Sequence, residues 1–503
     1  MATKEREIAS TGIPGLDAVL SGGLTRNRSY LVQGDPGVGK TTLGLHFLLE
    51  GVKNRERVLY IGLSETADEL KAVADSHGWS LDGIDVFEYS AAERLNEEGE
   101  TTLFHPSEIE LGEATERMMQ EVERVNPSRI VIDSLSEVRL LAQNPLRYRR
   151  QILGLKNFFT GKRATVLLLD DKSINTGDMQ LLTLAHGVIM LEQLSPLYGS
   201  ERRRLRVSKY RGMKYRGGYH DFTIRTGGLA VFPRLVAAES RHEYALERLA
   251  SGITEIDSLV GGGIDRGTST LIIGPPGTGK SALATQYAIA AAERGENAAM
   301  FIFDESRATM FGRAAAIRLN LLEHVESGKI TVQQIDPAEI PPGEFVDLVR
   351  ESVETRNVSV VVIDSLNGYM NAMPEESFLA IQMHELLTYL GQHRVATLLI
   401  VAQSGVMGTT MQSPVDVSYL ADSVILLRYF ELGGEIRKAV SVLKKRSGSH
   451  ERTIRPFSIG AEGLKVGPPL SELRGIIGGT PVVNVTLATG VENLGGTTRE
   501  ESK

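Results

Sequence analysis

The chain of 503 residues contains no cysteine. This absence excludes disulfide bonds, and it excludes zinc or iron–sulfur sites that depend on cysteine ligands. Long apolar runs are also missing, so no segment has the length and hydrophobicity to cross a bilayer. The first seven residues are charged and lack the apolar core of a signal sequence, so we expect a cytoplasmic protein without a membrane partner.

An excess of basic charge is missing as well. The formal net charge is -8 at pH 7, and this acidic balance argues against general nucleic-acid binding. The 10 histidines suggest no metal-ligand cluster, and no nucleophilic triad is recognisable. Hydrophobic residues make up 42% of the chain, which suits a globular protein with buried cores, and the length predicts several domains.

A phosphate-binding loop occurs twice. Gly34 to Thr41 and Gly274 to Ser281 both fit G-x-x-x-x-G-K-[ST], in which backbone N–H groups and a helix N-terminus surround phosphate oxygens. Chance could produce one such match in a glycine-rich chain, but both copies follow an apolar run and precede a helix-like stretch, as the motif requires. The residues predicted to bind nucleotide are Gly34, Gly37, Val38, Gly39, Lys40, Thr41 and Thr42, and in the second copy Gly274, Gly277, Thr278, Gly279, Lys280, Ser281 and Ala282.

The repeat is larger than the loop. Thr11 to Asp17 aligns with Ser251 to Asp257, which indicates a duplicated domain. The predicted parts are an N-terminal domain over residues 1–236, a linker over 237–249, a C-terminal domain over 250–483 and a mobile tail over 484–503.

Both halves alternate predicted strands and helices. An apolar run ends in Asp133 in the first half and in Asp364 in the second, which is the Walker B pattern of a magnesium-binding aspartate at a strand end. Alternating strands and helices, with the chemistry at strand ends, predict an α/β fold with a mostly parallel, doubly wound sheet in each half and helices on both faces. The residues predicted to hold Mg²⁺ beside ATP are Thr41, Asp133, Ser281, Asp304 and Asp364.

Acidic residues follow the first strand after each loop. Glu65 in the first half, and Asp304 and Glu305 in the second, are the candidate general bases for activating an attacking oxygen. We expect these strands to lie next to the P-loop strands, which would bring the acids close to a γ-phosphate. The alternative for any one of these acids is a helix cap or a solvated residue.

A basic pair occurs late in each half, as Lys209 with Arg211 and as Lys444 with Arg446. Residues at i and i+2 of a strand share a face, so each pair could meet one phosphate group together. Such a pair can act on the nucleotide of a neighbouring subunit, as an arginine finger does. The alternative is an edge strand protected by charge. The arginine runs at 147–150 and 202–204 are better explained as solvated faces than as a DNA-binding surface.

The chain resembles the KaiC family of ATPases and autokinases over nearly its whole length, from Thr11 to Val483. The resemblance implies two tandem RecA-like P-loop domains, a homohexamer of two stacked rings with ATP between subunits, ATP hydrolysis in the N-terminal ring and serine/threonine autophosphorylation in the C-terminal ring. It also implies regulatory partners such as a KaiB-like protein, and a role in circadian rhythm. The stretches that carry the resemblance are Thr11 to Asp17, Asp133 to Leu135, Lys209 to Gly212, Phe303 to Arg307 and Ser423 to Leu427.

The sequence departs from the family pattern at three places. Ser64 stands where the family has the first of two glutamates, and Asp304 is one methylene shorter than the family's general base. Ser418 matches the serine of the family's two phosphoacceptors, while Tyr419 replaces the threonine, so the predicted acceptors are Ser418 and Tyr419. Two other hypotheses remain open: a RecA- or DnaB-like motor on DNA, and a nucleotide-gated scaffold that barely turns over.

Overall fold

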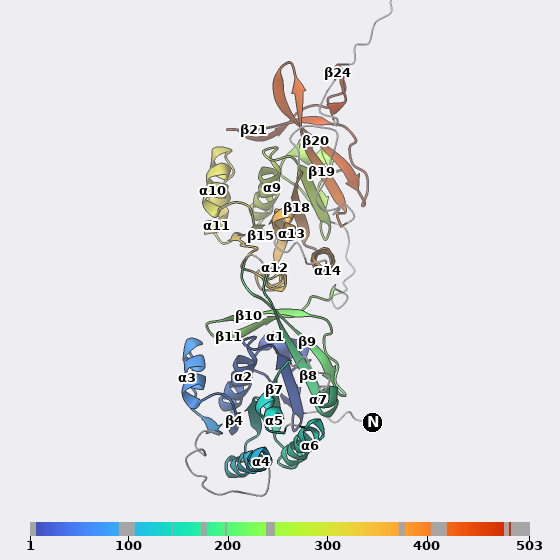
Figure 1. Cartoon of the computed structure of the whole chain (residues 1–503). Helices are drawn as coiled ribbons and strands as arrows, with labels where there is room; N and C mark the ends of the chain where they lie inside the picture. The colour runs from blue at the N-terminus through green and yellow to red at the C-terminus, as the bar shows by residue number, and fades with distance from the viewer. Residues whose placement is uncertain are drawn as a thin grey trace, which may run out of the picture. The chain divides into compact units, whose positions relative to one another are not determined.

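The computed structural model describes residues 7–89, 106–142, 144–172, 179–196, 199–237, 247–371, 378–403, 420–476 and 482–483. The chain divides into two compact units, Met1–Val236 with Asp336–Glu351, and Ala237–Ile335 with Ser352–Lys503. Each unit contains one nine-stranded sheet, and we call the segments that form these sheets the N-terminal repeat and the C-terminal repeat (Figure 1).

The sheet of the N-terminal repeat has the strand order β11-β10-β9-β8-β3-β7-β6-β4-β5. The strands from β8 to β5 run parallel, and β9, β10 and β11 add an antiparallel end. The strands of this repeat are β1 Ile8–Ala9, β2 Leu24–Thr25, β3 Ser29–Gly34, β4 Val58–Gly62, β5 Ile84–Glu88, β6 Arg129–Asp133, β7 Thr165–Asp171, β8 Gly187–Leu194, β9 Arg202–Tyr210, β10 His220–Arg225 and β11 Gly228–Phe232. The helices are α1 Pro14–Val19, α2 Lys40–Lys53, α3 Ala67–Ser76, α4 Pro106–Val125, α5 Leu135–Ala142, α6 Pro145–Gly161 and α7 Met179–Leu184.

The sheet of the C-terminal repeat has the same plan, in the order β16-β15-β17-β18-β14-β19-β20-β21-β22. The strands of this repeat are β12 Arg248–Leu249, β13 Ile264–Asp265, β14 Ser269–Gly274, β15 Asn297–Ile302, β16 Ile330–Gln334, β17 Val358–Asp364, β18 Ala396–Ala402, β19 Ser423–Leu432, β20 Glu435–Lys445, β21 Arg455–Gly460, β22 Gly463–Val466, β23 Leu473–Arg474 and β24 Val482–Val483. The helices are α8 Thr254–Leu259, α9 Lys280–Glu293, α10 Arg307–Ala316, α11 Leu321–Glu326, α12 Pro342–Arg356, α13 Leu366–Asn371 and α14 Leu379–Gln392. The predicted fold class is confirmed: both sheets are mostly parallel and carry helices.

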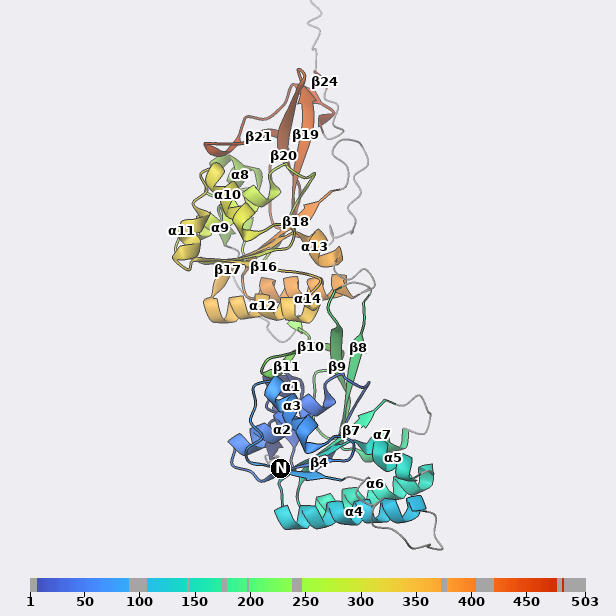
Figure 2. The same cartoon turned by 60° about the vertical axis from the view of Figure 1, so that its left-hand side comes forward.

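Helices cover both faces of the N-terminal sheet because its parallel strands are apolar on both sides. Tyr30 and Val32 of β3 pack into one core with α2 and α3, while Leu31 between them packs into a second core with α4, α5 and α6. Figure 2 shows these two helix layers on opposite faces of the sheet. Sandwiched in this way, the sheet holds the carboxyl ends of its strands in a fixed array, and these ends carry the polar residues.

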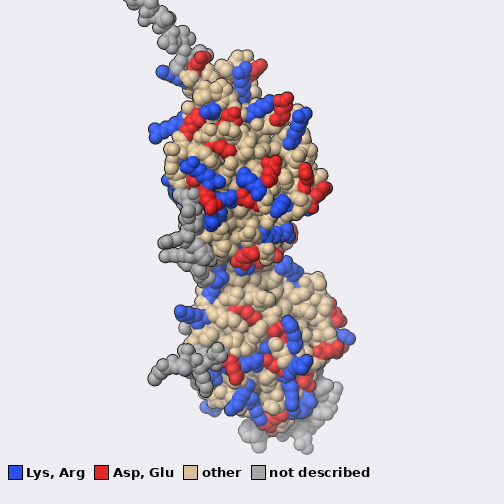
Figure 3. All heavy atoms as spheres, turned by 180° about the vertical axis from the view of Figure 1, so that it is seen from behind, with Lys and Arg blue, Asp and Glu red and all other residues tan. Residues whose placement is uncertain are grey.

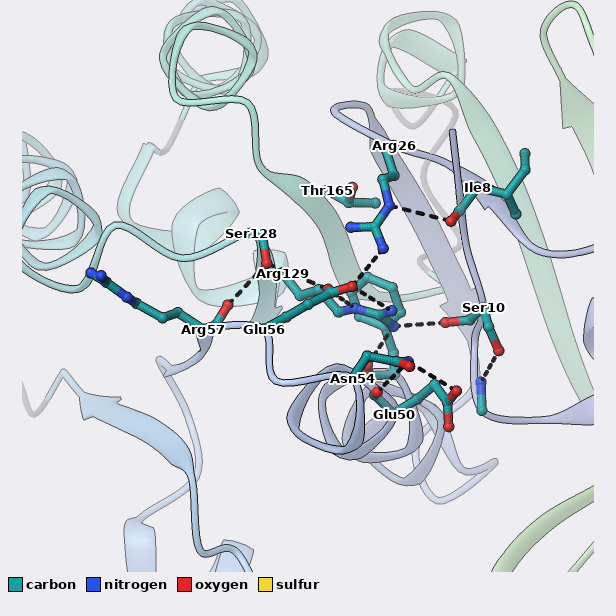
Figure 4. Close-up of polar contacts among 12 residues, drawn as sticks. Ile8, Ser10, Arg26, Glu50, Asn54, Glu56, Arg57, Ser128, Arg129 and Thr165 are labelled. Carbon is teal, nitrogen blue, oxygen red and sulfur yellow. Dashed lines mark hydrogen bonds and ion pairs between the residues drawn. The ribbon is translucent and has the colours of Figure 1, made fainter. Parts of the chain in front are cut away.

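A buried arginine ties the start of β6 to its surroundings. Arg129 is 0% exposed, and its Nε lies 2.6 Å from Glu56 Oε2. The same guanidinium donates hydrogen bonds to the carbonyl oxygens of Ser10, at 2.7 Å, and Phe47, at 2.9 Å. Arg26 also pairs with Glu56, so that two arginines share one carboxylate (Figure 4). Burial opposes the charge on Glu56, but the hydrogen bonds from Arg129 and Arg26 outweigh it and lower the pKa of Glu56.

The expected adjacency of the base-carrying strands to the P-loop strands is wrong. In the N-terminal sheet β7 and β6 lie between β3 and β4, and in the C-terminal sheet β18 and β17 lie between β14 and β15. The neighbours of β3 are β7 and β8. Strand order depends on long-range crossovers that a local sequence pattern does not encode. The acids after β4 and β15 are therefore separated from the P-loop strand by two strands, one of which is the Walker B strand.

Candidate functional site

Each P-loop connects a central strand to a helix. Gly39 and Gly279 are the N-caps of α2 and α9, and both have φ 106°, in the left-handed region. A Cβ on Gly39 would lie 2.7 Å from Ile224 Cδ1, so the loop needs glycine there for space as well as for conformation. The other residues predicted to bind nucleotide occupy this loop and the first turn of its helix: Gly34, Gly37, Val38, Lys40, Thr41 and Thr42, and Gly274, Gly277, Thr278, Lys280, Ser281 and Ala282.

The Walker B aspartate of the N-terminal repeat meets the P-loop hydroxyl. Thr41 Oγ1 donates a hydrogen bond to Asp133 Oδ2 at 2.7 Å, and the Tyr60 hydroxyl donates to the same oxygen at 2.9 Å. Asp133 is 4% exposed, and burial raises its pKa. A hydroxyl beside a buried carboxylate is a set of hard oxygen donors that fits Mg²⁺. Thr41 and Asp133, predicted as metal ligands, are thus brought together.

The lysines of the two P-loops differ in their contacts. Lys40 Nζ donates to the carbonyl oxygens of Gly34 and Asp35, and it also lies 2.8 Å from Asp171 Oδ1. Lys280 Nζ donates to the carbonyl oxygens of Gly274, at 2.8 Å, and Pro275, at 2.9 Å. Burial lowers the pKa of Lys280, while the charge of Asp364 acts in the opposite direction. Lys280 also lines a cavity of ≈ 290 Å³, together with Gly279, Ser281, Arg313 and Lys438.

Asp364 occupies the Walker B position of the C-terminal repeat and is 8% exposed. Burial raises its pKa to about 6, and the charges of Glu305 and Asp304 act in the same direction. A hydrogen bond with Ser281 and the charge of Arg313 oppose this shift. The predicted metal ligands Ser281, Asp304 and Asp364 therefore interact electrostatically. Among the described residues, no three acidic or histidine side chains are arranged so that they could hold a metal ion by themselves.

The candidate bases have different partners in the two repeats. Glu65 Oε2 is buried and has no hydrogen-bond partner among the described residues. Burial, together with the charges of Asp133 and Glu69, raises the pKa of Glu65 to about 6, while Lys40 acts in the opposite direction. A carboxylate with such a pKa and an unpaired oxygen suits a general base.

In the C-terminal repeat both carboxylates of the predicted pair have partners. Ser365 Oγ donates a hydrogen bond to Asp304, and Arg313 holds Glu305 through Nη1 and Nη2, at 2.7 Å each. The charge of Glu305 is thereby neutralised by a neighbouring cation. Asp304 is bound only by a neutral hydroxyl among the contacts of the described residues, so it is the better placed of the two to accept a proton.

The lysine of each basic pair lies on a strand, and the arginine follows the end of that strand. Lys209 Nζ and Arg211 Nη2 both donate to the carbonyl oxygen of Thr183. Lys444 Nζ donates to the Ala421 carbonyl at 2.8 Å, and Arg446 forms an ion pair with Asp422 at 3.2 Å.

A register shift precedes both lysines, between Val188 and Ile189 in one sheet and between Val424 and Ile425 in the other. Bulges of this kind re-aim side chains and are common beside active sites.

These basic pairs lie away from the P-loop of their own repeat. In the register of the sheet, Lys209 of β9 lies beside Val188 of β8, and Val188 lies beside Leu31 of β3. Leu31 is three residues before Gly34. Three residues correspond to about 10 Å along the strand. The side chain of Lys209 then turns toward residues 182–183, which precede β8. Each pair therefore sits near the amino ends of the parallel strands, whereas the P-loop follows a carboxyl end.

The predicted phosphoacceptors Ser418 and Tyr419 lie outside the described residues. The first described residue after them is Leu420, which is 6% exposed. Ser269 Oγ donates to the Leu420 carbonyl at 2.9 Å, so the chain that leaves the acceptors is fixed at the start of β14.

Some residues of these sites escape prediction from the sequence. Asp171, Arg313 and Tyr60 contact predicted site residues, yet none belongs to a recognised motif. The sequence signal for Asp171 is its place as the second of two acids at a strand end. The signal for Arg313 is a cation on the helix that follows Glu305. Tyr60 carries no local signal, because it alternates with apolar residues inside a buried strand.

The arginine run at 202–204 finds partners inside the chain. Arg204 stacks on Tyr219 at 4.1 Å and pairs with Glu192 at 3.0 Å. On the face drawn in Figure 3, lysine and arginine side chains are interspersed with aspartate and glutamate, with no stripe of one sign. In the part of the chain that the structure describes, no helix is long and apolar enough to cross a membrane.

Comparison with known proteins agrees with this architecture. Residues 9–236 and 249–471 match the family described as "ATPase: KaiC". The chain is 27% identical to the circadian clock protein KaiC3 of Synechocystis sp. over 97% of both chains. It is 26% identical to the circadian clock oscillator protein KaiC of Synechococcus elongatus, over 94% of this chain and 91% of that protein. Since the family match covers both repeats, the chain belongs to the KaiC family of ATPases.

Proposed function

We propose that the protein is a hexameric Mg-ATPase and serine autokinase whose nucleotide and phosphorylation state is read by partner proteins. The observation that carries this proposal is the separation, in each sheet, between the P-loop and the basic pair. In each copy, the phosphate-binding groups lie at one end of the strands and the cations at the other. The ATP site is completed when a second copy brings its cations to the P-loop of the first. ATP then lies at each subunit interface.

In the C-terminal repeat, Lys280 binds the β- and γ-phosphates, and Ser281 and Asp364 hold Mg²⁺, which neutralises charge on the phosphates. Asp304 accepts the proton of the Ser418 hydroxyl as its oxygen attacks the γ-phosphorus. Lys444 and Arg446 of the neighbouring copy stabilise the charge on the transferred group.

The position of the chain near Ser418 supports transfer between subunits. Lys444 donates to the Ala421 carbonyl, so the segment that follows Ser418 lies at the same end of the sheet as the basic pair. Leu420 and Ala421 therefore lie at the end of the sheet opposite to the P-loop of the same copy, which supports transfer to Ser418 from the P-loop of a neighbouring copy.

In the N-terminal repeat, Glu65 activates water rather than a hydroxyl of the chain. The groups that bind ATP and Mg²⁺ are Lys40, Thr41 and Asp133, and the neighbouring copy supplies Lys209 and Arg211. Ser64 leaves Glu65 as the single glutamate at this position, and its unpaired Oε2 is the atom available to a water molecule. The relatives are named as circadian clock proteins, which supports a role in circadian rhythm, and the family resemblance suggests a KaiB-like partner; both belong to the same proposal.

The test is ATP turnover by the full chain and by the variants Lys40→Ala and Lys280→Ala, with the assembly state followed by native mass spectrometry. We expect Mg-ATP to produce hexamers and each variant to remove part of the turnover. Monomers in saturating ATP would contradict the shared site. Turnover that rises strongly with added DNA would favour a DNA motor, and hexamers without turnover would favour a nucleotide-gated scaffold.

A further inference from the structure

The strands beside the two P-loops differ at the position paired with the first glycine of each loop. The registers pair Gly34 with Asp171 of β7, and Gly274 with Ala402 of β18. Both lysines donate to the first two carbonyl oxygens of their loop. Among the contacts of the described residues, Lys40 also meets a carboxylate, at 2.8 Å, and Lys280 does not. Because the two sheets share one plan of strands and the loop glycines share one conformation, this contact distinguishes the N-terminal site from the C-terminal site.

Hydrogen bonds with Ser136 hold the carboxylate of Asp171 in its position. Ser136 Oγ donates to Asp171 Oδ2 at 2.9 Å, and the Asp171 N–H donates to Ser136 Oγ at 3.2 Å. Burial favours the neutral form of Asp171, but the hydrogen bonds from Lys40 and Ser136 outweigh it, so the pKa of Asp171 is lowered. Asp171 therefore carries its negative charge throughout the neutral pH range.

A P-loop lysine exists to neutralise the β- and γ-phosphates. We propose that Asp171 competes with these phosphates for Lys40, so that the N-terminal site binds ATP more weakly than the C-terminal site. This inference rests on the proposed nucleotide binding at both loops. The competition acts as an internal equilibrium: the nucleotide binds the fraction of molecules in which Lys40 has left Asp171, and the apparent affinity falls by that fraction.

Two other roles for Asp171 fit the contacts less well. A general base needs a free lone pair and a pKa near the working pH, whereas both oxygens of Asp171 already accept hydrogen bonds and its pKa is lowered. Glu65 has both properties. A magnesium ligand would stand beside Thr41, and that place is taken by Asp133.

The experiment uses the full chain with one P-loop disabled. In the Lys280→Ala background, titration with fluorescent N-methylanthraniloyl-ATP and Mg²⁺ reports the N-terminal site, and in the Lys40→Ala background it reports the C-terminal site. Adding Asp171→Ala to the first background should tighten binding about tenfold, and adding Ala402→Asp to the second should weaken it about tenfold. Asp171→Asn should behave as Asp171→Ala, because it keeps the shape and removes the charge.

Unchanged or weaker binding by Asp171→Ala, in protein with an unchanged melting temperature, would overturn the inference. The experiment is also decisive if the Lys280→Ala protein binds no nucleotide. In that case, nucleotide binding that is restored by adding Asp171→Ala supports the competition. A continued lack of binding refutes the competition together with the proposed first site. A result in which Lys280→Ala binds ATP and Asp171→Ala changes nothing refutes the competition alone and leaves the proposed function intact.

Discussion

Arg313 holds both carboxylate oxygens of Glu305, through hydrogen bonds of 2.7 Å each. The equivalent position in the N-terminal repeat cannot form such a pair, because it is Val73. Val73 lies seven residues after the helix-capping residue Thr66, just as Arg313 lies seven residues after Ser306. One repeat therefore neutralises its glutamate, while the other leaves Glu65 with an unpaired buried oxygen. This contrast matches the division of labour proposed for the repeats, with water activation in the first and hydroxyl activation by Asp304 in the second.

The first prediction concerns Arg313. Burial raises the pKa of Asp364, and the charge of Arg313 opposes this shift, so Arg313→Ala should raise the pKa of Asp364 further. The acid limb of the pH–rate profile for Ser418 phosphorylation should then shift to higher pH. Initial rates measured between pH 5 and 9 test this shift. Arg307→Ala, an exposed residue of the same helix, is the control, and identical profiles for both variants would contradict the prediction.

The second prediction concerns hydrolysis in the N-terminal repeat. Glu65 must be ionised to act as a base, and its pKa is raised to about 6. Turnover in the Lys280→Ala background should therefore rise with pH, with a midpoint near this value, and Glu65→Gln should lower it about 100-fold. Asp68→Asn, an exposed neighbour at the start of α3, should leave turnover unchanged. Equal rates for Glu65→Gln and Asp68→Asn would rule Glu65 out as the base.

The third prediction follows from the same pKa through stability. A carboxyl whose pKa is higher in the folded state than in the unfolded state binds more protons when folded. Stability is then lost as pH rises from 4.5, the ordinary pKa of a glutamate side chain, through about 6. In the absence of nucleotide, Glu65→Gln should unfold at a higher urea concentration than the unmodified chain at pH 8, and at the same concentration at pH 4. An equal increase in the urea concentration of unfolding at both pH values would show that the effect does not come from ionisation of Glu65.

The fourth prediction concerns the buried ion pair of Figure 4. Arg129→Met removes the donors to Glu56, Ser10 and Phe47, and should destabilise the N-terminal repeat by about 3 kcal/mol. Arg26→Met should cost about 1 kcal/mol or less, since the Arg26 side chain is 28% exposed. The single tryptophan, Trp79, lies in this repeat, so its fluorescence follows the unfolding. Equal losses for the two variants would show that burial of Arg129 adds nothing.

The sequence predicts the elements well because the repeat, the P-loops and the apolar strands are local signals. Arg129–Asp133 and Val358–Asp364 form strands that end at the predicted aspartates. Strand order is not a local signal, so the prediction that β4 lies beside β3 is wrong. The contacts of Lys40 with Asp171, 131 residues later in the chain, depend on that same order and could not be read from spacing.

The most direct measurement uses two inactive variants in one mixture. Ser418→Ala keeps the P-loop and lacks the acceptor, while Lys280→Ala keeps the acceptor and lacks the P-loop lysine. Each is incubated with Mg-ATP alone and mixed under conditions that exchange subunits, and phosphopeptides covering Ser418 and Tyr419 are mapped by mass spectrometry. We predict phosphate on Ser418 in the mixture and in neither variant alone. Phosphate on Ser418 of the Lys280→Ala protein by itself would contradict the assigned site, and none in the mixture or in the unmodified chain would contradict the autokinase.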